Sequence, residues 1–399
     1  MLSPTAPASG SAPRRWSTPE LRPISAEART YAPRAPAGLR TDETLRGGFG
    51  PGEVLDVRAE AAALRRALIV IPTLNEAAVV GRVIEQVLAD DGLIDPLVVV
   101  ADGGSVDGTR EIVREIARRD PRVRLIHNPG RLQSAGVNCA AASAAGGRAW
   151  LVRVDAHADY PPNYVSTLVS EARRTEATAV VVSMDTVGEG AFQRAVAAAQ
   201  NSLLGAGGSA HRRASEAQWV DHGHHALLEV AAFEAVGGYD ETFSHNEDAE
   251  LDVRLAQQGG KIWLTDKVRI RYFPRGAPRA LWKQYLSYGA GRARTVLKHS
   301  TALKMRQALP LAVAPAAMGA LLSPLAPILL LPALVWMVAC LTFGLVLAAR
   351  TRDPAVALSG PAAMIMHLAW SAGFWMRLIT HASQRFAGDL PAPSRHAAS

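Results

Sequence analysis

Val152–Tyr160, which reads Val-Arg-Val-Asp-Ala-His-Ala-Asp-Tyr, is the stretch that decides the fold. It begins as a β-branched run and ends in carboxylates and an imidazole, which is typical of a buried strand that delivers ligands to the carboxyl edge of a parallel sheet. Asp155 and His157 are separated by one residue, so on an extended strand both point to one face. A bend after the strand lets both approach one divalent ion. A strand followed by a solvated turn explains this stretch equally well, so the neighbouring segments have to decide.

Three further strand patterns precede this stretch, and each is followed by polar residues and a helical pattern. Ala67–Pro72, Pro96–Ala101 and Val123–His127 are the apolar runs. Strands that alternate with helices predict a doubly wound α/β fold, with a mostly parallel sheet and its ligands at the carboxyl edge. A strand at 179–183 and a helix at 227–236 extend the pattern. Residues 188–219 between them mix helix-forming segments with a run of small residues at 205–209, and we expect a mobile loop there on the acceptor side.

Composition separates this α/β region from the two ends of the chain. Residues 1–60 are rich in Ala, Pro, Arg and Ser and predict a disordered leader, and they lack the apolar centre of a signal peptide. Gln307–Ala349 and Pro354–Met376 contain no charged residue. A span needs roughly 20 apolar residues, so residues 307–380 predict two or three membrane spans. We therefore expect an α/β domain at 61–278, membrane helices at 307–380 and a basic tail at 381–399.

The positive charge is concentrated immediately before the apolar region. The net charge is +7, and residues 267–306 carry eleven Lys and Arg without Asp or Glu. Residues 279–306 also carry Trp282 and two tyrosines, which predicts a basic amphipathic helix at the membrane surface. The positive-inside rule then places the α/β domain in the cytoplasm, on a multi-pass protein of the inner (plasma) membrane. A nucleic-acid partner is disfavoured, because the basic block adjoins the membrane segments and no nucleic-acid motif accompanies it.

Several motifs in order resemble family 2 glycosyltransferases of the GT-A fold. They are Ile71–Glu76 (Ile-Pro-Thr-Leu-Asn-Glu), Asp102–Thr109 (Asp-Gly-Gly-Ser-Val-Asp-Gly-Thr) and Asp155–His157, and the resemblance spans about 67–288. It is strongest to membrane-anchored glucosyltransferases of succinoglycan-type exopolysaccharide assembly. The resemblance implies a nucleotide-sugar donor, expected to be UDP-glucose, a divalent metal (Mg²⁺ or Mn²⁺), and a polyprenyl-diphosphate-linked saccharide acceptor. Membrane lipid and other membrane proteins of polysaccharide assembly are the further partners that it suggests.

The resemblance also assigns roles to individual residues. His157 stands where the family usually has a second aspartate, and an imidazole suits Mn²⁺ better than Mg²⁺. The metal ligands implied are Asp155 and His157, with Asp159 as an auxiliary candidate. The donor contacts implied are Pro72, Thr73, Asn75, Glu76, Asp102, Ser105, Asp107, Arg131, Gln133, Asn138 and Asp155.

Glu247 and Asp248 stand where the family carries its catalytic pair. By the resemblance Asp248 is the base and Glu247 orients the acceptor, whereas the simpler interpretation is a helix start that Asn246 caps and acidic residues favour. A carboxylate that takes the proton of a sugar hydroxyl, without a second carboxylate as nucleophile, predicts single displacement with inversion. Asp221–His225 holds three histidines, but adjacent histidines cannot all face one zinc ion, so we expect a loop that lines the sugar pocket.

Three other activities remain open. A polyprenyl-phosphate sugar synthase would share the donor site and have little need for Asp248. A catalytically silent nucleotide-sugar-binding scaffold would bind the donor without transfer. A processive synthase is disfavoured, because no Gln-x-x-Arg-Trp motif follows the acidic pair.

Overall fold

The computed structural model describes residues 67–93, 96–206 and 216–388. The predicted leader at 1–60 and the end of the predicted tail, from residue 389, lie outside the described residues. Within them eight strands form one sheet with the order β3-β2-β1-β4-β7-β5-β8-β6. The strands are β1 Ala67–Thr73, β2 Leu97–Asp102, β3 Val123–His127, β4 Trp150–Arg153, β5 Ala179–Thr186, β6 Gln218–Val220, β7 His224–Glu229 and β8 Ile262–Tyr272.

The first four strands are parallel to one another, and β5 is parallel to β8. Strand β7 inserts between β4 and β5 and is antiparallel to both, and β6 is antiparallel to β8 at the edge. The helices are α2 Val80–Leu88, α3 Thr109–Arg119, α4 Gln133–Ala144, α5 Tyr164–Thr175, α6 Ala191–Gln200, α7 Leu203–Ala206, α9 Val230–Ala235, α10 Glu247–Gln257, α11 Pro278–His299, α12 Met305–Leu311, α13 Val313–Leu321, α14 Leu330–Thr351 and α15 Ser359–Gly388, with short 3-10 turns η2 Pro327–Leu329 and η3 Pro354–Leu358.

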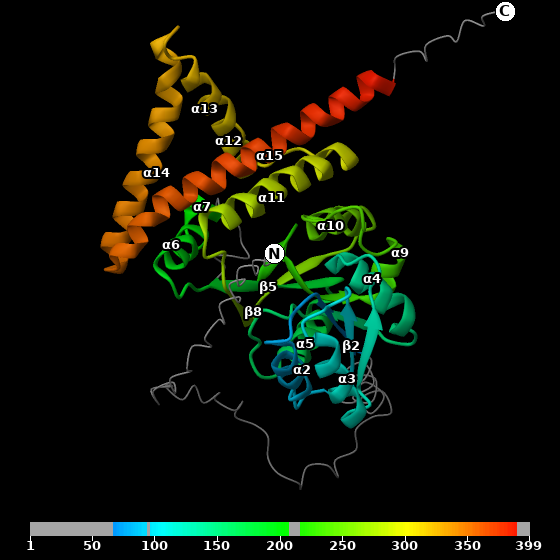
Figure 1. The fold of residues 1–399 in the computed structure, drawn as a ribbon. Helices are drawn as coiled ribbons and strands as arrows, with labels where there is room; N and C mark the ends of the chain where they lie inside the picture. The colour runs from blue at the N-terminus through cyan, green and yellow to red at the C-terminus, as the bar shows by residue number, and fades with distance from the viewer. Residues whose placement is uncertain (1–66, 94–95, 207–215, 389–399) are drawn as a thin grey trace, which may run out of the picture. The chain divides into compact units, whose positions relative to one another are not determined.

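Helices cover both faces of the sheet, which explains the uninterrupted apolar strands (Figure 1). In β1, Ile69 and Ile71 belong to the core on the side of α2, α3 and α5, whereas Leu68 and Val70 belong to the core on the side of α4, α9 and α10. Full burial of each such side chain contributes about 1.5–3 kcal/mol. The predicted α/β class, with a mostly parallel sheet and helices on both faces, is confirmed.

Two local predictions are wrong. Residues 227–229, expected to open a helix, end strand β7, because the gap between β4 and β5 supplies hydrogen-bonding partners on both sides. Residues 191–206, expected to be a mobile loop, form helices α6 and α7. Helix α6 is fixed because Val196 and Ala199 are buried against α11 and α15.

The C-terminal region contains two helical segments that are long and apolar enough to cross a membrane, 327–351 and 354–384. The apolar surface of this region marks the protein as membrane-associated. Helix α15 lies along α11 and continues to Gly388, past the end predicted for the membrane region at 380 (Figure 1). Helix α11 does not lie alone as an interfacial helix would: it packs between α15 and α10 of the α/β domain.

Candidate active site

The carboxyl ends of β1, β2 and β4 meet at one edge of the sheet. Thr73 is the register partner of Asp102, and Val70 is the register partner of Arg153, the last residue of β4. The polar residues that follow these strands are therefore brought together by the parallel pairing, as the edge rule for α/β sheets requires.

The loops after β1 and β2 are fastened to each other by the residues predicted to bind the donor. The backbone N–H of Asn75 donates to Ser105 Oγ (2.8 Å), and Val106 N–H donates to Asn75 Oδ1 (3.0 Å). Asn75 adopts a left-handed φ of 60°, which asparagine tolerates better than most residues. Glu76 N–H and Ala77 N–H donate to Thr109 Oγ1 (2.8 Å) and to the Asp107 carboxylate (3.0 Å).

Asp102 closes the turn that starts the second of these loops. Its side chain is buried, and its carboxylate accepts the N–H groups of Gly104 and Ser105, both at 3.1 Å. Thr73 Oγ1 lies 3.5 Å from the same carboxylate. This geometry explains why an aspartate stands here, and the contact between Asp102 and a uracil ring stays a prediction.

A cavity of about 510 Å³ lies beside this edge, and five predicted site residues line it: Gln133, Asp155, His157, Glu247 and Asp248. The opposite wall comes from the C-terminal part of the chain, with Tyr285 and Tyr288 of α11 and His367 and Trp370 of α15. The two tyrosines, which the sequence placed at the depth of lipid headgroups, thus face the cavity. His222, Gly223 and His224 also line it, in keeping with the predicted pocket loop.

Arg153 joins the carboxylates of the two predicted centres. Its side chain is 6% exposed, and its Nη1 lies 2.7 Å from Asp248 Oδ1 and 3.8 Å from Glu247 Oε1, while its Nε lies 3.3 Å from Asp155 Oδ1. Gln133 donates to the same Asp155 oxygen, and His224 Nε2 lies 3.4 Å from the other. Burial alone would raise the pKa of Asp155, but Arg153 and His224 outweigh it and hold the pKa well below its usual range.

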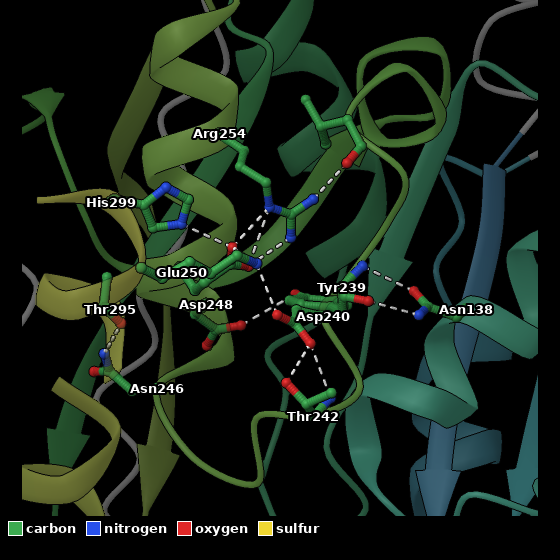
Figure 2. Close-up of polar contacts among 12 residues, drawn as sticks. Asn138, Tyr239, Asp240, Thr242, Asn246, Asp248, Glu250, Arg254, Thr295 and His299 are labelled. Atoms are coloured by element: carbon green, nitrogen blue, oxygen red, sulfur yellow. Dashed lines mark hydrogen bonds and ion pairs between the residues drawn. The ribbon is translucent and has the colours of Figure 1, made fainter. Parts of the chain in front are cut away.

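The acidic pair opens helix α10. Besides Arg153, the Asp248 carboxylate accepts a hydrogen bond from the Tyr239 hydroxyl at 3.0 Å (Figure 2). Burial, together with the charge of Asp248, raises the pKa of Glu247 to about 7 despite the nearby Arg153. Glu247 therefore exchanges a proton near neutral pH, and the role of Asp248 as the base stays a prediction.

Helix α11 fixes the start of α10. Asn246 occupies the N-cap position with a φ of 69°, but its side chain makes no capping bond and donates instead to Thr295 Oγ1 at 3.0 Å. The predicted N-cap position of Asn246 is confirmed, but its side chain does not cap the helix. Glu250, one turn into α10, accepts from Arg254, Lys298 and His299, and Figure 2 shows the first and third of these contacts. The acidic pair is thus held by the helix that leads into the membrane region.

The residues around Asp155 fit a divalent metal as an incomplete protein site. His157 is largely exposed to the cavity, and its Nδ1 lies 3.7 Å from the Glu76 carboxylate. One carboxylate and one imidazole leave several coordination positions for the oxygens of a bound diphosphate. Among the described residues no group of three or more His, Cys, Asp or Glu side chains forms a ready cation site.

Asn138, Arg131 and Asp159 line neither this cavity nor the two fastened loops. The Asn138 amide is bonded to the Tyr239 backbone (2.8 and 2.9 Å) and to Glu241, so it supports the turn before α10 (Figure 2). Arg131 is an exposed turn residue with a φ of 58°. The Asp159 carboxylate pairs with Arg82 of α2, so the suggested auxiliary metal ligand points to a different partner.

Sequence reasoning overlooked Arg153 and Tyr239, and it did not predict the contact of His224 with Asp155. A signal existed for the first, because an arginine between Val152 and Val154 in a buried strand requires compensating acids. Tyr239 and His224 gave no comparable signal, since their contacts depend on how α10 and β7 dock.

The sheet, the fastened loops and the facing acids define a glycosyltransferase of the GT-A fold. Residues 68–237 match the family model described as Glycosyl transferase family 2. The chain is 52% identical over 312 residues to succinoglycan biosynthesis protein ExoA of Rhizobium meliloti (strain 1021). This match covers 78% of this chain and 94% of the relative. The chain belongs to glycosyltransferase family 2, and it is an enzyme of that class.

Two solved structures are similar to parts of the chain at low sequence identity. A mannosyltransferase from Pyrobaculum calidifontis, in complex with GDP-mannose and Mn²⁺, is 19% identical with a TM-score of 0.44, and the match covers 82% of this chain and 88% of that one. GalNAc-T7 with UDP, GalNAc and Mn²⁺ is 16% identical with a TM-score of 0.42, and the match covers 62% and 57%.

Proposed function

We propose that this protein transfers glucose from UDP-glucose to a lipid-linked oligosaccharide, with inversion, in the biosynthesis of a succinoglycan-type extracellular polysaccharide. The observation that carries the proposal is the convergence of Asp155 and Asp248 on one cavity, with Arg153 between them. The relative from Rhizobium meliloti supports the polysaccharide class.

The donor side of the cavity is the sheet edge. The loops 73–77 and 102–109, held together by their own hydrogen bonds, offer a nucleotide a preformed edge of small residues, and Gln133 and His224 hold Asp155 in place. Asp155 and His157 would hold a divalent metal, Mn²⁺ or Mg²⁺, which would stabilise the negative charge of the leaving diphosphate. An imidazole ligand favours Mn²⁺ of the two.

The acceptor side is the wall formed by α11, α12 and α15. Asp248 takes the proton from the attacking sugar hydroxyl as the new bond to the anomeric carbon forms, and the nucleotide diphosphate leaves from the opposite face. Tyr239 and Arg153 hold the carboxylate in place for this step. An α-linked donor then gives a β-linked product.

The membrane helices and basic side chains suggest where the acceptor lies. Arg275 and Arg292 line the cavity next to Tyr285 and Tyr288, which suits a saccharide attached to a polyprenyl diphosphate. We place the protein in the plasma membrane with the catalytic domain in the cytoplasm, because the basic residues of 267–306 adjoin the apolar region. Other membrane proteins of polysaccharide assembly are the expected partners.

The test is a transfer assay with the full chain in native membranes. Labelled UDP-glucose, UDP-galactose and GDP-mannose are each offered with polyprenyl-diphosphate oligosaccharides and with polyprenyl monophosphate. We expect transfer from UDP-glucose to the oligosaccharide, in a β linkage that a β-glucosidase removes. Transfer to the monophosphate alone would identify a polyprenyl-phosphate sugar synthase, and UDP binding without transfer would identify a scaffold.

A further inference from the structure

The path of the apolar helices relative to the catalytic domain is set by contacts on α15. Helix α15 lies along α11 at very close range: a Cβ on Gly289 would lie 1.9 Å from the Trp370 carbonyl oxygen, and one on Gly373 would lie 2.0 Å from that of Leu286. Small residues at such contacts let two helix backbones touch. Helix α11 carries Lys283, Arg292 and Arg294, among others, and is bonded to α10, so α15 is held beside the catalytic domain.

The chain enters the apolar region at the junction of α12 and α13, and this junction is bonded to α15. Pro315 has no N–H to donate to the carbonyl of Leu311, four residues earlier in the helix. Ser371 Oγ and Trp375 Nε1 of α15 donate to this carbonyl instead, each at 2.9 Å. The junction of α12 and α13 is thereby fixed to α15.

The chain also returns to the catalytic domain after α14. Asp353, between α14 and α15, pairs with Arg194 of α6 at 2.8 Å. The last part of α14 packs closely on the start of α15, where a Cβ on Gly344 would lie 2.6 Å from the Gly360 nitrogen. Both ends of the α13–α14 hairpin thus stand on the side where the catalytic domain lies, as Figure 1 shows.

Between these two anchors the surface is apolar on several sides. The exposed side chains of α14 include Leu330, Leu331, Leu334, Val335, Met337, Val338, Leu341, Leu345 and Val346. Exposed leucines on adjoining faces of one helix, in a stretch with no charged residue, are suited to lipid rather than to water.

The tip of the hairpin is also apolar. Leu325 is 85% exposed there, and the turn 322–329 carries no charge. Five of its N–H groups donate to carbonyls at 2.9–3.2 Å, those of Leu322, Ser323, Leu325, Ala326 and Leu329. Pro324 and Pro327 have no N–H to satisfy. A turn in hydrocarbon must meet its own backbone hydrogen bonds, because each unmet group costs several kcal/mol.

Length decides between crossing the bilayer and turning back inside it. Helix α13 has nine residues, which at about 1.5 Å per residue gives about 14 Å. The hydrocarbon core is about 30 Å thick. The tip follows directly after α13, the shorter arm, so it reaches about half the depth of the hydrocarbon core. Helix α14, the longer arm, must therefore lie at a tilt to the membrane normal.

We propose that α13 and α14 form a re-entrant hairpin that enters and leaves the lipid bilayer from the face of the catalytic domain, and that α15 lies along this face without crossing. The hairpin replaces the multi-pass arrangement expected from the sequence. It also keeps Arg350 and Arg352 on the face of the catalytic domain, as the positive-inside rule favours. Two crossing spans would place both arginines on the far side. The proposal does not depend on which sugar is transferred.

The test places single cysteines in the full chain, in membrane vesicles of both orientations, after Cys139→Ala and Cys340→Ala remove the two native thiols. The exposed Arg118→Cys on α3 marks the face of the catalytic domain. A membrane-impermeant maleimide is then applied to Thr351→Cys, Leu325→Cys and Ser383→Cys. We expect Thr351→Cys and Ser383→Cys to react from the same face as Arg118→Cys. Leu325→Cys should react from neither face until denaturing detergent dissolves the membrane.

Each other result overturns the proposal in a specific way. Reaction of Leu325→Cys from the face opposite Arg118→Cys would show that the hairpin crosses, and its reaction from the same face would show that the tip lies in water. Reaction of Thr351→Cys or Ser383→Cys from the opposite face would show that α14 or α15 spans the bilayer. As a second measurement, a fluorophore on Leu325→Cys should be quenched more by nitroxides deep in the acyl chains than by nitroxides at the headgroups, and the reverse order would contradict the hairpin.

Discussion

Arg153 Nη1 lies 2.7 Å from Asp248 Oδ1, so a buried guanidinium at the end of strand β4 contacts the proposed base at the start of helix α10. The same side chain reaches Asp155, the proposed metal ligand. One cation thus compensates three largely buried acids, and it sets both their positions and their charge.

Replacement of Arg153 tests whether this cation sets the positions and the ionisation of the three acids. Arg153→Met leaves Asp155, Glu247 and Asp248 without their shared cation, so the pKa of Asp155 rises and the acidic limb of the rate profile moves to higher pH. Loss of one partner of a buried ion pair typically costs about 3–5 kcal/mol. Arg153→Lys keeps the charge but not the forked geometry, and should restore part of the rate and most of the pH profile.

The pH dependence of kcat/KM for both variants is the measurement, with the exposed Arg118→Met as control. An Arg153→Met enzyme with an unchanged acidic limb would show that Arg153 does not set the ionisation of the site.

Glu247 makes the stability of the protein depend on pH. Its pKa is about 7 in the folded chain against an ordinary value of 4.5. Between these values the folded state holds a proton that the unfolded state has lost, so this group's contribution is complete below pH 4.5 and falls by about 1.4 kcal/mol per pH unit until pH 7. Glu247→Gln removes this dependence.

The thermal unfolding midpoint in detergent checks the effect at pH 5 and at pH 8. We expect Glu247→Gln to be more stable than the native chain at pH 8, with a smaller difference at pH 5. A difference that is the same at both pH values would contradict the raised pKa.

The contact of α15 with α11 predicts an unusual response to alanine. Gly373→Ala places a Cβ 2.0 Å from the Leu286 carbonyl oxygen, and a backbone atom cannot move aside as a side chain can. Overpacking of this kind costs about 1–3 kcal/mol. In Gly319→Ala, the matched control within helix α13, the nearest atom to the new Cβ is 3.8 Å away.

Alanine favours a helix over glycine by about 1 kcal/mol, so the control should keep or raise the unfolding midpoint while Gly373→Ala lowers it. Equal midpoints for the two variants would show that α11 and α15 are not in close contact.

The sequence predicted the parts of the fold that depend on local pattern. Strands β1 and β2 are continuous apolar runs, and the alternation of strands with helices predicted the parallel order that places Asp102 and Asp155 at one edge. Strand β7 escaped prediction, because Leu227 and Leu228 also suit a helix and only the gap between β4 and β5 makes them a strand. The approach of Asp248 to Asp155 came from the family resemblance, since its cause is tertiary: α11 holds α10 through Thr295 and Lys298.

The same limit applied to the membrane region. Its apolar composition was evident from the sequence, but whether a helix crosses or lies along the domain depends on Gly289, Gly373 and the Leu311 carbonyl that accepts hydrogen bonds from α15. Such contacts are set by docking and leave no periodic pattern in the chain.

Asp248→Asn tests the central claim, that this residue is the base of an inverting transfer. General base catalysis typically supplies 10²–10⁴-fold in rate, so transfer by Asp248→Asn should fall by about that factor while UDP binding, measured in parallel, stays unchanged. The exposed Asp185→Asn is the matched control and should transfer at the native rate. A near-native transfer rate in Asp248→Asn would contradict the account.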